Sequence, residues 1–121
     1  MKVVEVAFTG YPVTDVERAR KFYEGTLGLT PARNFGDDRV GWIEYDIGPA
    51  TLALGSGIPD WKPSRGGGSA GLEVDDFAAA MREIQAGQYT VLAGPIETPV
   101  CFMAVVADPD GNAVTIHKRK P

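Results

Sequence analysis

The chain has 121 residues, of which 44% are hydrophobic and 23% charged, proportions that are typical of one ordinary globular domain. Its 16 Asp and Glu residues against 12 Lys and Arg give a net charge of -4, which disfavours binding to nucleic acid or anionic lipid. The single cysteine, Cys101, excludes an internal disulfide and a thiolate-rich metal cluster. Because neither a long apolar run nor a signal-peptide pattern occurs, we expect a cytoplasmic protein without nucleic-acid or membrane partners.

The first half of the sequence predicts a strand, a helix and three short strands. Residues 3–8 are rich in β-branched residues and predict a strand that stops before Gly10 and Pro12. Thr14 followed by Glu17 fits a capping box, and an apolar stripe at helical spacing comes after it. The three strands that follow are expected at about residues 29–34, 40–46 and 51–54.

The same order of elements is expected again after a linker. Residues 57–68 are rich in Gly and Pro and show no periodicity. Beyond them we expect a strand at 69–74, a helix that is capped by Asp75 or Asp76, and short strands near 90–92, 101–107 and 112–117. We therefore predict a single α+β domain of two tandem βαβββ modules, at about residues 1–56 and 69–121, joined by the linker at about 57–68.

Three segments carry a resemblance to a known family. Residues 11–23, YPVTDVERARKFY, followed by Leu27-Gly28-Leu29, resemble the first-helix signature of the vicinal oxygen chelate superfamily, which includes glyoxalases, bleomycin-resistance proteins and dioxygenases. Residues 71–76 are similar to the junction between its fifth strand and second helix, and residues 108–112 to its final hairpin. The resemblance spans essentially the whole chain. It implies a curved mixed sheet around one concave pocket, and a homodimer.

Metal-dependent members of that family hold an ion with four side chains, one from the first and one from the last strand of each module. Counting from the motifs places these positions at Phe8, Ala53, Ser69 and Thr115. None of these side chains is a good ligand for a divalent transition metal. If this placement is shifted by one residue, only Glu5, Glu44, Glu73 or His117 becomes available as a metal ligand. We therefore predict no catalytic metal and no cofactor, which puts the metal-assisted activities of the family in doubt.

Alternation of side chains along the strands predicts what lines the pocket instead. The candidate ligand-binding residues are Phe8, Trp42, Ser69, Glu73, Phe102 and Thr115. Glu44 and His117 are candidates for a general base and acid, because burial raises the pKa of a carboxylate and imidazole titrates near neutrality. The simpler interpretation makes His117 a solvated strand residue and Glu44 an exposed strand carboxylate.

Two further residues have open roles at this point. Trp61, in the linker, is either a lid over the pocket or an anchor for a loop or a dimer contact. A hairpin register that places Phe102 opposite His117 turns Cys101 toward the core, whereas a one-residue slip brings Cys101 toward His117. Because a free buried cysteine is usually a small hydrophobic residue, we favour that role over a reactive thiol.

Three functions are compatible with these observations. The leading hypothesis is a metal-independent, glyoxalase/bleomycin-resistance-like protein that binds a small organic ligand, cationic or aromatic, in the pocket between the modules. The second is a lyase or isomerase that uses Glu44 and His117 for proton transfer, or that recruits a metal through shifted ligands. In the third, the pocket is filled by its own side chains and no ligand binds.

Overall fold

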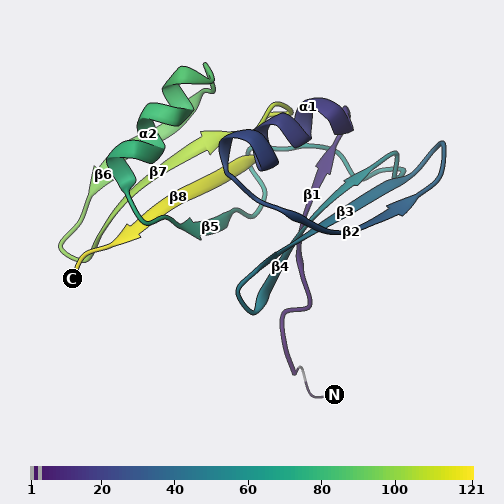
Figure 1. The fold of residues 1–121 in the computed structure, drawn as a ribbon, viewed down its shortest axis with the longest axis horizontal. Helices are drawn as coiled ribbons and strands as arrows, with labels where there is room; N and C mark the ends of the chain where they lie inside the picture. Colours follow the sequence, from purple (N-terminus) through teal and green to yellow (C-terminus); the bar gives the residue numbers. More distant parts are fainter. Residues whose placement is uncertain (1, 3) are drawn as a thin grey trace. The chain divides into compact units, whose positions relative to one another are not determined.

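The computed structural model describes residue 2 and residues 4–121, and the chain divides into two compact units, Met1–Pro63 and Ser64–Pro121. Each unit has four strands and follows the order βαβββ (Figure 1). The division falls inside the predicted linker. The predicted α+β class with tandem βαβββ modules is confirmed. Within the described part of the chain, no helix has the length and hydropathy that crossing a membrane requires.

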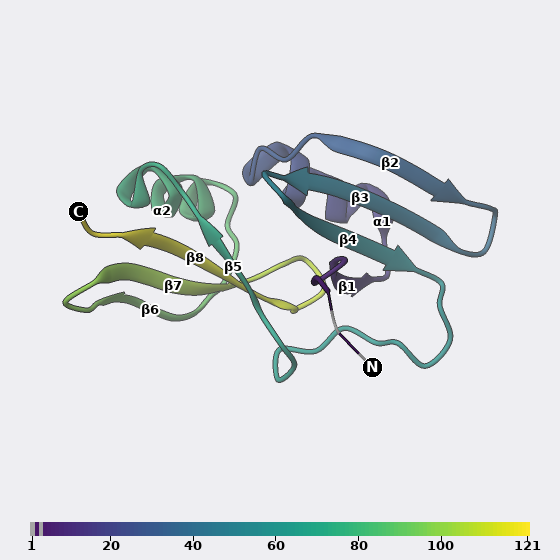
Figure 2. The ribbon, with the colours of Figure 1, turned by 90° about the horizontal axis from the view of Figure 1, so that it is seen from below.

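The first unit is one four-stranded sheet with a helix against one face. Its strands lie in the order β1-β4-β3-β2, and β1 pairs with β4 in parallel while the other pairs are antiparallel (Figure 2). The strands are β1 Thr9–Val13, β2 Pro31–Gly36, β3 Gly41–Ile47 and β4 Ala50–Ser56. The helix α1 is Val16–Arg20, and it continues as the π-helical segment η1 Lys21–Thr26.

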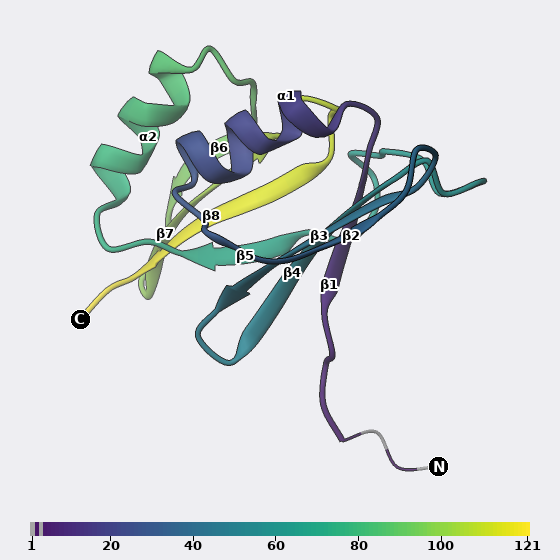
Figure 3. The same cartoon turned by 45° about the vertical axis from the view of Figure 1, so that its right-hand side comes forward.

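Two expectations for this unit were wrong in detail. The strand predicted at residues 3–8 begins only at Thr9, because the parallel ladder with β4 starts at the pair Thr9 and Leu52. Residues 4–8 run on beyond the sheet, and residue 3 lies outside the described residues (Figure 3). The helix is capped by Asp15 rather than by Thr14, since the Asp15 carboxylate accepts a hydrogen bond from the Arg18 amide at 3.0 Å.

A buried tyrosine joins the helix of the first unit to its sheet. The Tyr45 ring on β3 is fully buried, stacks 6.4 Å from Tyr23 on η1, and donates its hydroxyl to Glu24 at 2.9 Å. Burial and the Glu24 carboxylate raise the pKa of Tyr45, so the phenol stays protonated. Arg20 holds the pKa of Glu24 below its usual value. The face of the sheet that carries Tyr45 is therefore the core face.

The second unit repeats this plan. Its strands lie in the order β5-β8-β7-β6, with β5 and β8 parallel, and α2 packs against β7 and β8 (Figure 3). Of the two predicted caps, Asp76 is the one that accepts the Ala79 amide, at 2.9 Å. The elements are β5 Ala70–Glu73, α2 Phe77–Ala86, β6 Val91–Glu97, β7 Cys101–Ala107 and β8 Ala113–Arg119.

The strand β6 is longer than expected. The sequence predicted a strand near residues 90–92, and the Gly94-Pro95 dipeptide that lies beyond it is a typical strand breaker. In the structure β6 lies at the edge of the sheet, where a proline without an amide hydrogen is tolerated. The pairing of β6 with β7 shifts register on either side of Ala93, so the ladder continues past the proline.

A buried aspartate holds the turn between β7 and β8. Asp108 is 3% exposed, and its carboxylate accepts hydrogen bonds from the amides of Asp110 and Asn112 and from the Asn112 side chain, at 2.8 to 2.9 Å. The Asn112 side-chain oxygen accepts from the amide of Ser64 at 3.1 Å, which fixes the beginning of the second unit. Residues 108–112 therefore form the turn between β7 and β8 and also hold the beginning of the second unit in place.

We expect Asp108→Ala to lower the free energy of unfolding by about 2 kcal/mol, because it leaves buried amide donors without an acceptor. Urea denaturation measures the change. Asp38→Ala, an exposed turn aspartate in the first unit, is the matched control and should change stability by less than about 0.5 kcal/mol. Equal effects of the two substitutions would contradict this role of Asp108.

Candidate ligand-binding surfaces

In each unit the parallel strand pair contains or adjoins two of the four positions that the family resemblance predicts for metal ligands, which are Phe8, Ala53, Ser69 and Thr115. In the first unit Gly10 pairs with Ala53, and in the second unit Gly71 pairs with Thr115. Gly10 and Gly71 are 61 residues apart, the same offset that relates the two halves of the sequence. In the second unit the Ser69 and Thr115 hydroxyl oxygens lie 2.8 Å apart, so two of the predicted positions are direct neighbours.

The chemistry of these four positions does not fit a metal ion. Phe8 and Ala53 have no donor atom, and Ser69 and Thr115 contribute only neutral hydroxyls, which bind divalent transition metals poorly. No group of three or more His, Cys, Asp or Glu residues that could hold a metal occurs among the described residues. We therefore assign no chemical step at these positions to a metal ion.

Instead, three aromatic side chains cluster on the open face of the first sheet. Phe8 meets Trp42 edge-to-face at 5.2 Å, and Trp61 stacks on Trp42 at 6.2 Å with 28° between the rings. Trp61 comes from the linker and folds back over Gly10 and Gly55 of its own sheet. We call Phe8, Trp42 and Trp61 the aromatic patch. The packing of Trp61 on its own sheet is compatible with both a lid and a loop anchor, so its role stays a prediction.

Gly55 makes room for the Trp61 ring. A Cβ at Gly55 would lie 2.6 Å from the Trp61 ring and 3.1 Å from both Trp42 and Ile58. We expect Gly55→Ala to push Trp61 off the sheet, because Trp61 lies outside the strands whereas Trp42 is held in β3. Acrylamide quenching of tryptophan fluorescence should then increase. Gly67→Ala, where a Cβ meets nothing within 4 Å, is the control. Unchanged quenching in the Gly55 variant would contradict the packing.

Glu44 lies on the same open face, but its environment differs from the expected one. As predicted, Trp42, Glu44 and Asp46 share this face while Tyr45 is buried, and Glu44 pairs with Ala53. The Glu44 carboxylate accepts hydrogen bonds from the Arg33 guanidinium and, at 2.8 Å, from the Trp42 indole. These contacts lower the pKa of Glu44, whereas a general base was expected to have a raised one.

Arg33 was missed by the sequence analysis. It pairs with Glu44 across β2 and β3, and its guanidinium also donates two hydrogen bonds to Asp46, whose pKa it lowers. A signal was present, because a turn at residues 36–40 places positions 33 and 44 opposite each other. The two carboxylates are therefore neutralised in part, and the face is less acidic than expected.

We expect Arg33→Met to raise the pKa values of Glu44 and Asp46, which carboxyl-detected NMR titration measures. A carboxylate with a lowered folded-state pKa stabilises the fold above its unfolded pKa, here 4.5 for Glu, and loses this effect as the pH falls through the folded value. Wild type should therefore be more stable than Arg33→Met at pH 7, and equally stable once both carboxylates are protonated. Arg39→Met is the control. Unchanged carboxylate pKa values would contradict the network.

The open face of the second sheet carries a histidine that is held by a carboxylate. His117 Nδ1 lies 2.6 Å from Glu73, and Glu73 also accepts the Arg119 amide at 2.8 Å, which is the main reason its pKa is lowered. Ser69 and Thr115 lie on the same face. Four residues that were predicted to line a pocket therefore lie close together on this face. Their role in binding stays a prediction, as does joint acid-base action of Glu44 and His117, which belong to different units.

The register of β7 and β8 corrects two predictions. Met103 pairs with His117 and Phe102 with Lys118, one residue away from the expected register. Phe102 therefore lies on the helix face, where it stacks on Phe77, and not beside His117. Cys101 was expected in the core but shares the open face, buried at 6% exposure with its Sγ 3.2 Å from the Thr98 hydroxyl.

The cause of this shift is the length of the turn. The Asp108 amide donates to the Asn112 carbonyl, so the turn has one more residue than the Asp-Pro-Asp-Gly motif alone predicts. The closing pair is Ala107 and Ala113. A one-residue change in register moves every side chain on one strand to the other face relative to its partner.

Comparison with known proteins agrees with the fold and the resemblance. The family model of the Glyoxalase/Bleomycin resistance protein/Dioxygenase superfamily matches residues 5–116. The chain belongs to this superfamily. The lactoylglutathione lyase of Haemophilus influenzae is 25% identical to this superfamily member over 127 residues, which cover 97% of the chain and 94% of the relative.

Solved structures of similar proteins match over nearly the whole chain. TnmS3, an antibiotic binding protein from Streptomyces sp. CB03234, has 27% identity and a TM-score of 0.79, with 99% of both chains covered. A glyoxalase/bleomycin resistance protein from the same organism has 28% identity and a TM-score of 0.74, with 93% of this chain and 98% of that chain covered.

Proposed function

We propose that this superfamily member binds a small organic molecule with a planar aromatic part, and that the aromatic patch holds the ligand without a metal ion. The observation that carries the proposal is the edge-to-face and stacked arrangement of Phe8, Trp42 and Trp61 on an open sheet face. Ligand sites are usually lined by aromatic side chains with a few polar groups. The similar TnmS3, an antibiotic binding protein, supports binding as a function for this fold.

The patch is suited to binding because its central ring is already fixed. The Trp42 indole donates to Glu44, and Arg33 holds Glu44 in turn, so little side-chain entropy is lost when a ligand stacks on the ring. Phe8 remains 48% exposed, which leaves apolar surface to cover. Since Arg33 offsets the carboxylates, neutral aromatic ligands are favoured as well as the cationic ones expected from the sequence.

A second candidate is the lyase or isomerase. The pair of His117 and Glu73 favours it, because a carboxylate that orients an imidazole is a common arrangement for a general base. A curated relative at 25% identity is a lactoylglutathione lyase. In this alternative His117 and not Glu44 is the base, since Arg33 keeps the pKa of Glu44 low. The homodimer implied by the family resemblance is a separate proposal that neither candidate requires.

The binding proposal predicts that Trp42→Leu weakens the binding of 2-naphthol or quinoline at least about tenfold, which corresponds to about 1.4 kcal/mol. Isothermal titration and tryptophan fluorescence measure the affinity. Trp42→Phe is the matched control, because it keeps an aromatic face, and it should lose less. Equal affinity of wild type and Trp42→Leu for both probes would contradict the proposal.

His117→Ala separates the two candidates. If the protein only binds, this variant keeps its affinity for the aromatic probes, and neither it nor wild type forms or breaks down lactoylglutathione. If the protein is a lyase, wild type turns lactoylglutathione over and His117→Ala loses about 100-fold or more in rate. Product analysis by chromatography distinguishes these results.

A further inference from the structure

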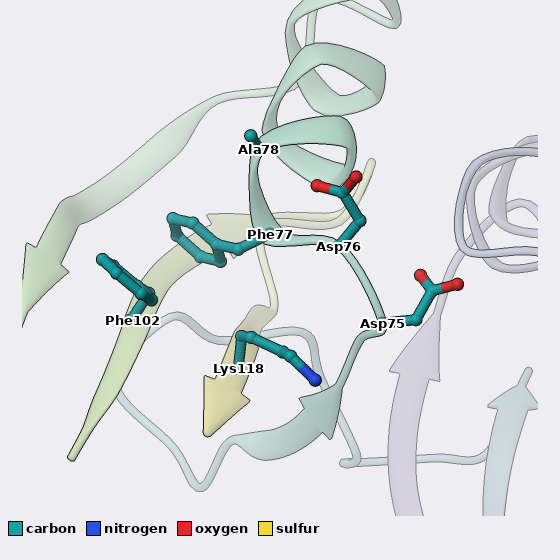
Figure 4. A pocket seen from close by; sticks show the side chains of 6 residues that line it. All are labelled: Asp75, Asp76, Phe77, Ala78, Phe102 and Lys118. Carbon is teal, nitrogen blue, oxygen red and sulfur yellow. The ribbon is translucent and has the colours of Figure 1, made fainter. Parts of the chain in front are cut away.

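The helix face of the second sheet carries a pocket that is separate from the open faces described above. Its volume is about 380 Å³, and it lies where α2 begins, above β7 and β8 (Figure 4). Because side chains alternate along β7 and β8, Phe102 and Lys118 point to the face opposite to Thr115 and His117. The pocket is lined by Asp75, Asp76, Phe77, Ala78, Phe102 and Lys118.

Two aromatic rings form the apolar wall of this pocket. Phe77 at the first turn of α2 stacks on Phe102 with 5.9 Å between the centroids and 24° between the planes. The Lys120 ammonium lies 4.8 Å from the centre of the Phe102 ring and is paired with Glu97 at 2.6 Å. The Phe102 ring is thus held in place, and a planar group can pack against the pair of rings.

Opposite charges line the pocket without contacting each other. Asp76 uses one carboxylate oxygen to cap α2. Neither Asp75 nor Lys118 forms an ion pair or a side-chain hydrogen bond with any residue in the described part of the chain. Both residues line the pocket, and Figure 4 shows the Asp75 carboxylate turned away from the two rings and from Lys118. Separated, unpaired charges of opposite sign beside an apolar wall are complementary to a ligand that carries both charges itself.

We infer that this pocket binds a small zwitterionic aromatic molecule of the aromatic amino-acid type. The ring of the ligand packs on Phe77 and Phe102, and its carboxylate pairs with Lys118. Its ammonium pairs with Asp75, whose exposed side chain rotates toward the ligand. A pocket of about 380 Å³ is within the usual range for small ligands. The inference does not depend on the proposed function, because the pocket is formed within the second unit alone.

The test is a titration of ¹⁵N-labelled protein followed by NMR, with L-phenylalanine as the probe. Phenethylamine, which lacks the carboxylate, and 3-phenylpropionate, which lacks the ammonium, are the matched ligands. We expect saturable shifts at the amides of residues 75–78, 102 and 118, and an affinity for L-phenylalanine at least about fivefold higher than for either analogue. L-Leucine, which lacks the ring, should bind more weakly still.

Variants assign the contacts. Lys118→Met should lower the affinity for L-phenylalanine at least about fivefold, to the level of phenethylamine, and leave the affinity for phenethylamine unchanged. Lys21→Met, an exposed lysine of the first unit, is the control. The absence of saturable shifts at the pocket, equal affinity for all four probes, or equal binding by Lys118→Met and wild type would each overturn the inference. The comparison of ligands uses wild type only and does not depend on the stability of the variants.

Discussion

The parallel pairing of the first and last strand in each unit determines where the candidate residues lie. Paired residues in a ladder project to the same face, so the pairs Gly10 with Ala53 and Gly71 with Thr115 define the open faces of the two sheets. The chain between paired parallel strands must cross over a face, and α1 with η1 and α2 cover the face that carries the core. One face of each sheet is thereby left uncovered by the helix of its own unit.

The two open faces have different chemistry. In the first unit Trp42, Phe8 and Trp61 provide aromatic surface, and Arg33 neutralises the adjacent carboxylates. In the second unit the hydroxyls and the pair of His117 and Glu73 provide polar groups. The fold is that of the superfamily, but the side chains at the four predicted metal-ligand positions are poor ligands for transition metals. The proposed ligand recognition therefore depends on stacking and hydrogen bonding.

The face of the sheet on which a side chain lies was predicted most reliably, because it depends only on alternation within one strand. Ile43 and Tyr45 are apolar neighbours of Trp42 and Glu44, so the faces of β3 follow from hydrophobicity alone. Pairing between strands was harder to predict, because it depends on turn length. The extra turn residue at Asn112 moved Phe102 away from the open face. Predicting the contact between Arg33 and Glu44 likewise required the length of the turn between β2 and β3.

We propose that this superfamily member functions without the metal that metal-dependent members of the superfamily bind. Elemental analysis of the purified protein tests it most directly, combined with thermal-shift series in Ni, Mn, Zn, Fe(II) and Mg salts against a chelator-treated sample. We expect no stoichiometric metal and no saturable rise in Tm, because Phe8, Ala53, Ser69 and Thr115 offer no adequate ligand set. Stoichiometric metal, or saturable stabilisation by one ion, would contradict it.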